Sequence, residues 1–180
     1  LLFYYEIYYI NQSLSLTLSS SSRDNLVGKT SLINGLTVTA PQSIDDMSLK
    51  MKDTSAVADP KMRGLRTACY QDVDVIVLCY SVMSPSSFKN VSEYWKEEIE
   101  FFADEVPVIL VGTKIDLRND THVVNQLKLE GMYPISSLEA NSLTEKLQFK
   151  KYIEYSATTQ VGMEEILDTV HLGKKLSFLP

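Results

Sequence analysis

VPVILVG, residues 106–112, leads straight into TKID, residues 113–116, and this stretch decides the fold. Continuous β-branched and apolar residues are typical of a strand buried on both faces, as the strands of parallel sheets are. A second run of this kind, VDVIVLCYS, occupies residues 73–81. Between the two runs, Ser84 can cap a helix that has Pro85 in its first turn. The segment therefore predicts a strand, a crossover helix and a second strand. The apolar positions of that helix are Phe88, Val91, Tyr94, Trp95, Ile99 and Phe102.

The alternation of strand and helix continues toward the C-terminus. Residues 138–147 and 161–176 predict helices, and KYIEY at residues 151–155 predicts a short strand between them. Together these elements predict an α/β fold, a doubly wound and mostly parallel sheet flanked by helices. Ligands of such sheets bind beyond the carboxyl ends of the strands. The loops after Ser22, Lys52, Gly112 and Tyr155 are therefore the places to look for chemistry.

The N-terminal segment differs in composition from the rest. Residues 11–22 are rich in serine, and Leu14, Leu16 and Leu18 alternate with polar residues as in a half-buried strand. We expect residues 1–22 to form an atypical low-complexity segment that can hold the first strand, and residues 23–180 to form the remaining domain.

Length and composition suit one soluble domain. A chain of 180 residues can bury a core without disulfides or metals, and its 44% hydrophobic and 22% charged residues are ordinary values. The net charge of −6 leaves no basic field for the phosphates of a nucleic acid polymer, which we exclude as a partner. The two cysteines, Cys69 and Cys79, are too few for a disulfide scaffold and favour a reducing compartment.

Both ends bear on membrane attachment. The apolar residues 1–10 are too few to span a bilayer. The fourth residue from the C-terminus, where a prenylated cysteine would stand, is Ser177. We therefore expect no lipid anchor in this chain and a cytoplasmic location, with any peripheral membrane contact made through partners.

Gly28-Lys29-Thr30 follows the possible first strand and opens a helix, which is the setting of a phosphate-binding loop. Backbone N–H groups at the helix start would face the phosphates, Lys29 would reach the β and γ phosphates, and Thr30 would bind Mg²⁺. The full pattern needs a glycine where this chain has Arg23. An ordinary helix start is the alternative interpretation.

TKID at the end of the second buried strand has the features of a guanine clamp. The Asp116 carboxylate can accept two N–H bonds from guanine, whereas adenine presents an acceptor at its ring nitrogen. The aliphatic part of Lys114 would lie along the base, and Thr113 would tie the loop to the phosphate loop. Taken alone, the tetrapeptide favours the alternative interpretation, a solvated Lys and Asp in a surface loop.

Ser156-Ala157-Thr158 follows the KYIEY strand, and its small side chains would let a backbone N–H approach the guanine carbonyl oxygen. Alone, this tripeptide does not indicate a binding site. GKT, Asp53-Thr54, TKID and SAT occur in this order, each at a predicted strand end. Each of the four motifs is a weak signal alone, but together, in this order and at strand ends, they are a strong one.

On these motifs the chain resembles a small GTPase of the Ras superfamily, specifically of the Rho type. TKIDLR at residues 113–118 and YSVMSPSSFKNVSEYW at residues 80–95 are similar to Rho sequences, as are Leu65-Arg66 and Tyr70. The resemblance spans residues 27–176 and implies that residues 23–180 form a small GTPase-like G domain. Residues 121–130 fall where the Rho type carries an extra short helix that some relatives use for partners, with a solvated surface helix as the alternative.

The resemblance implies a GTP-binding protein of signal transduction that regulates the cytoskeleton or trafficking. It implies GTP or GDP and Mg²⁺ as ligands, effector or regulator proteins as partners, and GTP hydrolase activity by family. The magnesium residues that it implies are Thr30 and Asp53. The nucleotide-binding residues are Val27, Gly28, Lys29, Thr30, Ser31, Thr113, Lys114, Asp116, Leu117, Ser156, Ala157 and Thr158.

Several positions depart from the family pattern. Asp53 comes only 23 positions after Thr30, whereas the family spends nearly twice as many on this segment, so much of the first switch is missing. Val57 occupies the position of the glutamine that orients the attacking water, and Asn25 replaces a glycine beside the γ-phosphate. No catalytic residue is therefore assigned, and we expect weak or absent intrinsic hydrolysis.

Two alternatives remain open at the level of sequence. The first is a pseudo-GTPase scaffold or binding module that does not cycle between nucleotide states. The second is a mis-assembled chain in which the serine-rich N-terminus replaces the true first strand and the protein folds poorly, because an unpaired buried hydroxyl costs about 1–3 kcal/mol.

Overall fold

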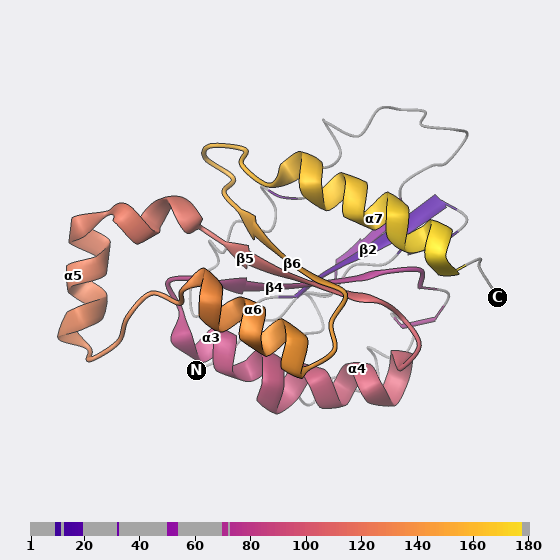
Figure 1. The fold of residues 1–180 in the computed structure, drawn as a ribbon, viewed down its shortest axis with the longest axis horizontal. Helices are drawn as coiled ribbons and strands as arrows, with labels where there is room; N and C mark the ends of the chain where they lie inside the picture. The colour runs from indigo at the N-terminus through magenta and orange to yellow at the C-terminus, as the bar shows by residue number, and fades with distance from the viewer. Residues whose placement is uncertain are drawn as a thin grey trace.

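The computed structural model describes residues 10–11, 13–19, 32, 50–53, 70–71 and 73–177. In this part of the chain, helices cover both faces of one sheet (Figure 1). The predicted α/β fold with a doubly wound, mostly parallel sheet is confirmed. Residues 33–49, where the sequence predicts a shortened first switch, lie outside the described part.

Within the described residues the sheet has six strands, and its main path runs in the order β1, β2, β4, β5, β6, with β3 paired to β2. All of these pairs are parallel except β1 with β2. Parallel neighbours need a crossover connection, which the helices supply. The strands are β1 Ile10–Asn11, β2 Ser13–Ser19, β3 Lys50–Asp53, β4 Ile76–Ser81, β5 Val108–Thr113 and β6 Lys151–Tyr155.

The strand β2 lies within the serine-rich segment, where the alternating leucines predict a strand. It pairs with β3 from Ser15 opposite Lys50 to Leu18 opposite Asp53. At its end it also pairs with β4, through Leu18 opposite Val77. The low-complexity segment thus supplies a strand with parallel neighbours on both sides.

A continuous helical rod joins β4 to β5, as the sequence predicts. The rod consists of α3 (Pro85–Asn90), the π-helical segment η4 (Val91–Trp95) and α4 (Lys96–Ala103). The Ser84 hydroxyl oxygen accepts a hydrogen bond from the Ser87 N–H at 3.3 Å, which caps the start of the rod. In η4 the Lys96 N–H bonds to the Val91 carbonyl five residues back, a spacing that apolar periodicity does not predict.

Side chains of β4 point alternately to the two faces of the sheet, and both faces are buried. Ile76 and Leu78 belong to a core that also contains residues of η4, α4 and α6 (Ser137–Lys146). Val77 and Cys79 pack instead in a core with residues of α7 (Met163–Ser177). Figure 1 shows α7 over one face and α3, α4 and α6 over the other. Burial on both sides is why this strand reads as an unbroken apolar run.

The predicted extra helix is present as α5 (Thr121–Leu129), which follows the short 3₁₀ helix η5 (Ile115–Asn119). The Asp120 side chain caps α5 by accepting from the N–H groups of His122 and Val123 at 2.9 and 3.1 Å. None of the α5 residues is buried. In Figure 1 the helix stands away from the sheet.

Candidate functional site

The register of the sheet brings the two predicted base loops to the same edge. Ser81 at the end of β4 lies opposite Thr113 at the end of β5, and Thr113 lies opposite Tyr155 at the end of β6. The loops that follow β5 and β6 therefore leave the sheet side by side. These are the TKID and SAT segments, which are 43 residues apart in the sequence from Thr113 to Ser156.

The TKID loop turns sharply as it leaves β5. Thr113 is buried, and its hydroxyl donates to the Tyr80 carbonyl oxygen at 2.9 Å, which ties the start of the loop to β4. Lys114 adopts a left-handed backbone conformation with φ 61° and ψ 36°, which is uncommon for a residue with a side chain. The Leu117 N–H then bonds to the Lys114 carbonyl at 3.1 Å and starts η5. The tie of Thr113 to the phosphate loop concerns residues that the structure does not describe and stays a prediction.

Asp116 and Ser156 join the two loops directly. The Ser156 hydroxyl donates to Asp116 Oδ1 at 2.6 Å and accepts the Thr159 N–H at 3.2 Å. Ser156 is fully buried, whereas Asp116 is partly exposed. Within the described residues Ser156 alone bonds the Asp116 carboxylate, so the carboxylate can still accept two N–H groups of a base.

A tight turn closes the SAT loop. The Ser156 N–H bonds to the Val161 carbonyl at 3.1 Å, and the Gln160 side-chain amide donates to the Ala157 carbonyl at 2.6 Å. Gly162 follows with φ +84°, and a Cβ at this position would lie 1.9 Å from the Glu154 carbonyl oxygen. Only glycine fits there. Ala157 is half-buried and Thr158 is exposed.

The phosphate half of the predicted site lies mostly outside the described residues, namely Val27, Gly28, Lys29, Thr30 and Ser31, together with Val57. Leu32, two positions after Thr30, is helical and fully buried in the core beneath α7. Asp53 ends β3 opposite Leu18, near the end of β2. A residue with a carboxylate thus stands at the carboxyl edge of the sheet. Carboxylate oxygens are ligands that Mg²⁺ prefers, and this is the edge at which the sequence predicts the magnesium site. The described residues contain no cluster of three or more His, Cys, Asp or Glu that could hold a metal ion by itself.

Sequence reasoning missed two residues that flank the base loops. Arg118 lies two positions after Asp116, Glu154 lies two positions before Ser156, and their side chains form an ion pair of 2.6 Å. The sequence does contain a signal for them, because two opposite charges each lie two positions from Asp116 or Ser156. It has meaning only once β5 and β6 are known to be neighbours.

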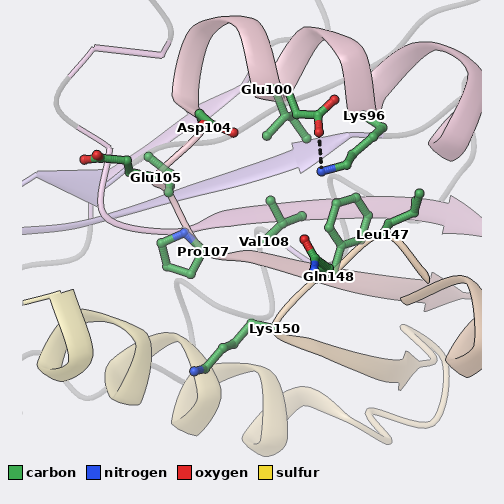
Figure 2. A pocket seen from close by; sticks show the side chains of 12 residues that line it. Lys96, Glu100, Asp104, Glu105, Pro107, Val108, Leu147, Gln148 and Lys150 are labelled. Atoms are coloured by element: carbon green, nitrogen blue, oxygen red, sulfur yellow. Dashed lines mark ion pairs between the residues drawn. The ribbon is translucent and has the colours of Figure 1, made fainter. Parts of the chain in front are cut away.

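A pocket of about 290 Å³ lies at the other end of the sheet (Figure 2). Val108 at the start of β5 and Lys150 just before β6 line it, together with the end of α4. Lys96 and Glu100 on its rim form an ion pair of 2.8 Å. Because the base loops follow the carboxyl ends of the same strands, this pocket is separate from them.

Comparison with known proteins gives consistent matches. The model of the Ras family matches residues 30–174. The Rho-related GTP-binding protein RhoV of Bos taurus is 36% identical over 168 residues, covering 83% of this chain and 70% of RhoV. The GTP-binding protein RHO1 of Eremothecium gossypii is 41% identical over 122 residues, 68% of this chain and 58% of that protein. RHO1 of Saccharomyces cerevisiae is 40% identical over 122 residues, 68% of this chain and 57% of that protein.

The parallel sheet and the paired loops at its carboxyl edge define a P-loop small G domain, a class of GTP-binding proteins. The chain belongs to the Ras family and, within that superfamily, to the Rho-type small GTPases. The resemblance drawn from the motifs is confirmed. Members of the family generally bind GTP or GDP with Mg²⁺ and engage effectors or regulators. Within the described residues no helix is long and apolar enough to cross a membrane.

Proposed function

We propose that this chain binds guanine nucleotide with Mg²⁺ and signals by engaging effector or regulator proteins, with weak or absent GTP hydrolysis. The observation that carries the proposal is the 2.6 Å bond from Ser156 to Asp116, which joins the TKID and SAT loops at one edge of the sheet. A carboxylate held in this way is preorganised to accept the N–H groups of guanine. Adenine has no matching pair of donors.

The phosphates would extend from the base toward Gly28, Lys29 and Thr30. Lys29 would neutralise phosphate charge, and backbone N–H groups at the helix start would donate to phosphate oxygens. Mg²⁺ would be held by Thr30 and through Asp53, and when bound it supplies charge neutralisation at the β and γ phosphates. Arg23 in place of glycine weakens this half, so the affinity is lower than is usual in the family.

Three sequence features support slow hydrolysis. Val57 has no polar group to orient a water molecule, Asn25 crowds the γ-phosphate, and the segment between Thr30 and Asp53 is short. The alignment with RhoV supports this shortening. It has 168 positions, which is more than the number of residues in 83% of this 180-residue chain, so some RhoV residues have no counterpart here. Phosphoryl transfer depends on positioning and charge stabilisation, so the loss of several positioning elements slows it strongly.

The partners would be effector or regulator proteins of cytoskeletal or trafficking pathways. The protein would act in the cytoplasm, peripheral to membranes where its partners are. A pseudo-GTPase scaffold or binding module that does not cycle between nucleotide states is the second candidate, and Val57 together with the short segment from Thr30 to Asp53 favours it.

Base identity tests the proposal directly. Acid extraction of the purified protein and chromatography of the released nucleotide should yield GDP or GTP. In competition binding, unlabelled GTP should displace a labelled guanine nucleotide and ATP should not. Asp116→Asn should move the preference toward xanthine nucleotides, because the amide can donate to the xanthine carbonyl. Displacement by ATP as effective as by GTP would contradict guanine selectivity.

Hydrolysis is tested by single turnover of preloaded GTP, measured beside an ordinary Rho protein at the same Mg²⁺ concentration. We expect a much slower rate, and we expect that Val57→Gln alone does not restore it while the first switch stays short. An activating partner should also fail, because its arginine typically adds about 10³–10⁵ to the rate only when water is already oriented. A rate equal to that of the reference protein would refute this part of the proposal.

A further inference from the structure

A second link connects the two base loops besides the bond from Ser156 to Asp116. Arg118 Nη1 lies 2.6 Å from Glu154 Oε1, and the two side chains are only 20% and 30% exposed. Arg118 belongs to the same 3₁₀ helix as Asp116, and Glu154 belongs to the strand that leads into Ser156. The same two segments are therefore joined at two points.

Further hydrogen bonds hold both partners of the ion pair in place. Arg118 Nε donates to the Ile135 carbonyl at 3.0 Å. Glu154 Oε1 also accepts the hydroxyls of Ser137 at 2.6 Å and Tyr152 at 3.0 Å. The pair is thus part of a network that includes η5, β6 and the start of α6.

The network extends across the sheet to β4. The Tyr80 hydroxyl donates to the Tyr152 hydroxyl oxygen at 3.1 Å. Gly112 on the intervening strand leaves room for this contact, because a Cβ there would lie 2.5 Å from the Tyr152 oxygen and 3.0 Å from the Tyr80 oxygen. Three adjacent strands therefore support the ion pair.

The charges of the pair are stable near neutral pH. Burial alone would raise the pKa of Glu154, but hydrogen bonds from Ser137, Arg118 and Tyr152 and the charge of Arg118 lower the pKa below the usual value of a glutamate. Burial alone would likewise lower the pKa of Arg118, and the hydrogen bond and charge of Glu154 outweigh it. Near neutral pH, Glu154 is therefore a carboxylate and Arg118 is a cation.

One contact between two segments lets them pivot, whereas two contacts fix their relative orientation. We infer that Arg118 and Glu154 are positioning residues that set the orientation of the Asp116 carboxylate and thereby the selectivity for the guanine base. This inference rests on the proposed guanine-nucleotide site. It assigns a role to the pair beyond holding the fold together.

The test compares GDP with IDP, whose base lacks the 2-amino group of guanine. A well-oriented carboxylate bonds two N–H groups of guanine and one of hypoxanthine, so misorientation weakens GDP binding more than IDP binding. Coupling within one hydrogen-bonded network changes an equilibrium by about two- to a hundredfold. In Glu154→Gln and in Arg118→Met we expect the ratio of the IDP to the GDP dissociation constant to fall about three- to tenfold.

The matched control is Glu165→Gln, which breaks the 2.7 Å pair between Glu165 and Lys151 at the other end of β6. Its affinity ratio should equal that of the unaltered protein. Should the two main variants fail to fold, Ser137→Ala removes one of the donors to Glu154 and should lower the ratio by a smaller factor in the same direction.

The outcomes separate the inference from the proposed function. An unaltered protein that binds neither nucleotide overturns the proposed function and this inference with it. An unaltered protein that prefers GDP, with variants that melt at lower temperature yet keep the same ratio, overturns the inference alone. The double variant, Arg118→Met with Glu154→Gln, should lower the ratio of the IDP to the GDP dissociation constant no further than either single change.

Discussion

Gly162 is the residue on which the closure of the SAT loop depends. Its φ of +84° disfavours any side chain, and a Cβ would meet the Glu154 carbonyl oxygen at 1.9 Å. That oxygen belongs to the backbone and cannot rotate away, so the strand or the turn must move. Since Glu154 and Ser156 lie on the displaced segment, the change reaches the base loop.

The prediction is that Gly162→Ala destabilises the protein and weakens guanine-nucleotide binding. Gly131 provides the control, because its φ is +70° but a Cβ at that position would meet no atom within 4 Å. Gly131→Ala should cost only the conformational penalty of about 1 kcal/mol. Urea denaturation and GDP titration should show a larger loss for Gly162→Ala in both quantities. Equal losses for the two variants would mean that the contact with Glu154 relaxes freely.

At the residue scale the sequence predicts the base loops better than their support. Asp116 and Ser156 are foreseeable because each belongs to a motif at the end of a predicted strand. Their 2.6 Å bond and the Arg118 to Glu154 pair depend on strand order and register. Periodicity fixes neither of these, because it reports which face a side chain takes and not which strand lies beside it.

At the scale of elements, the predictions are most accurate where burial dictates the pattern. KYIEY is β6 with the predicted bounds, and the helices at residues 138–147 and 161–176 are observed as Ser137–Lys146 and Met163–Ser177. Helix ends shift by one or two residues because capping decides them locally. The π-helical segment η4 escapes prediction because Val91 and Trp95 also fit an α-helical spacing.

The helix α5 contributes little to the stability of the fold, since none of its residues is buried and Leu129 is 88% exposed. Replacing residues 121–129 by a short Gly-Ser linker should change the free energy of unfolding by about 0.5 kcal/mol or less. In contrast, Trp95→Ala in η4 empties a site that is 1% exposed and should cost about 3–5 kcal/mol. Chemical denaturation of the two variants measures the difference. A large loss in the α5 variant would show that the helix packs on the domain.

At the scale of the whole molecule, the parallel sheet gathers loops from distant parts of the chain at one edge. The base loops follow β5 and β6, and the predicted phosphate loop follows β2 in the sequence. A nucleotide that spans both halves would contact segments that lie far apart in the sequence. Binding to the folded state alone then stabilises the whole domain by mass action.

The last prediction uses that stabilisation to measure the two halves of the site separately. GDP with Mg²⁺ at a hundred times its dissociation constant should stabilise the protein by about 2.7 kcal/mol. For a domain of this size, that corresponds to a rise in Tm of about 5–10 °C. GMP at the same concentration should give a smaller rise, because it makes fewer phosphate contacts with Lys29 and the helix start. Lys29→Ala should reduce the GDP effect to that of GMP, and Asp116→Ala should reduce both. Equal shifts with GDP and GMP in the unaltered protein would mean that residues 28–30 do not form a phosphate cradle, whereas loss of only the GDP advantage in Lys29→Ala would place the β-phosphate of the nucleotide at that lysine.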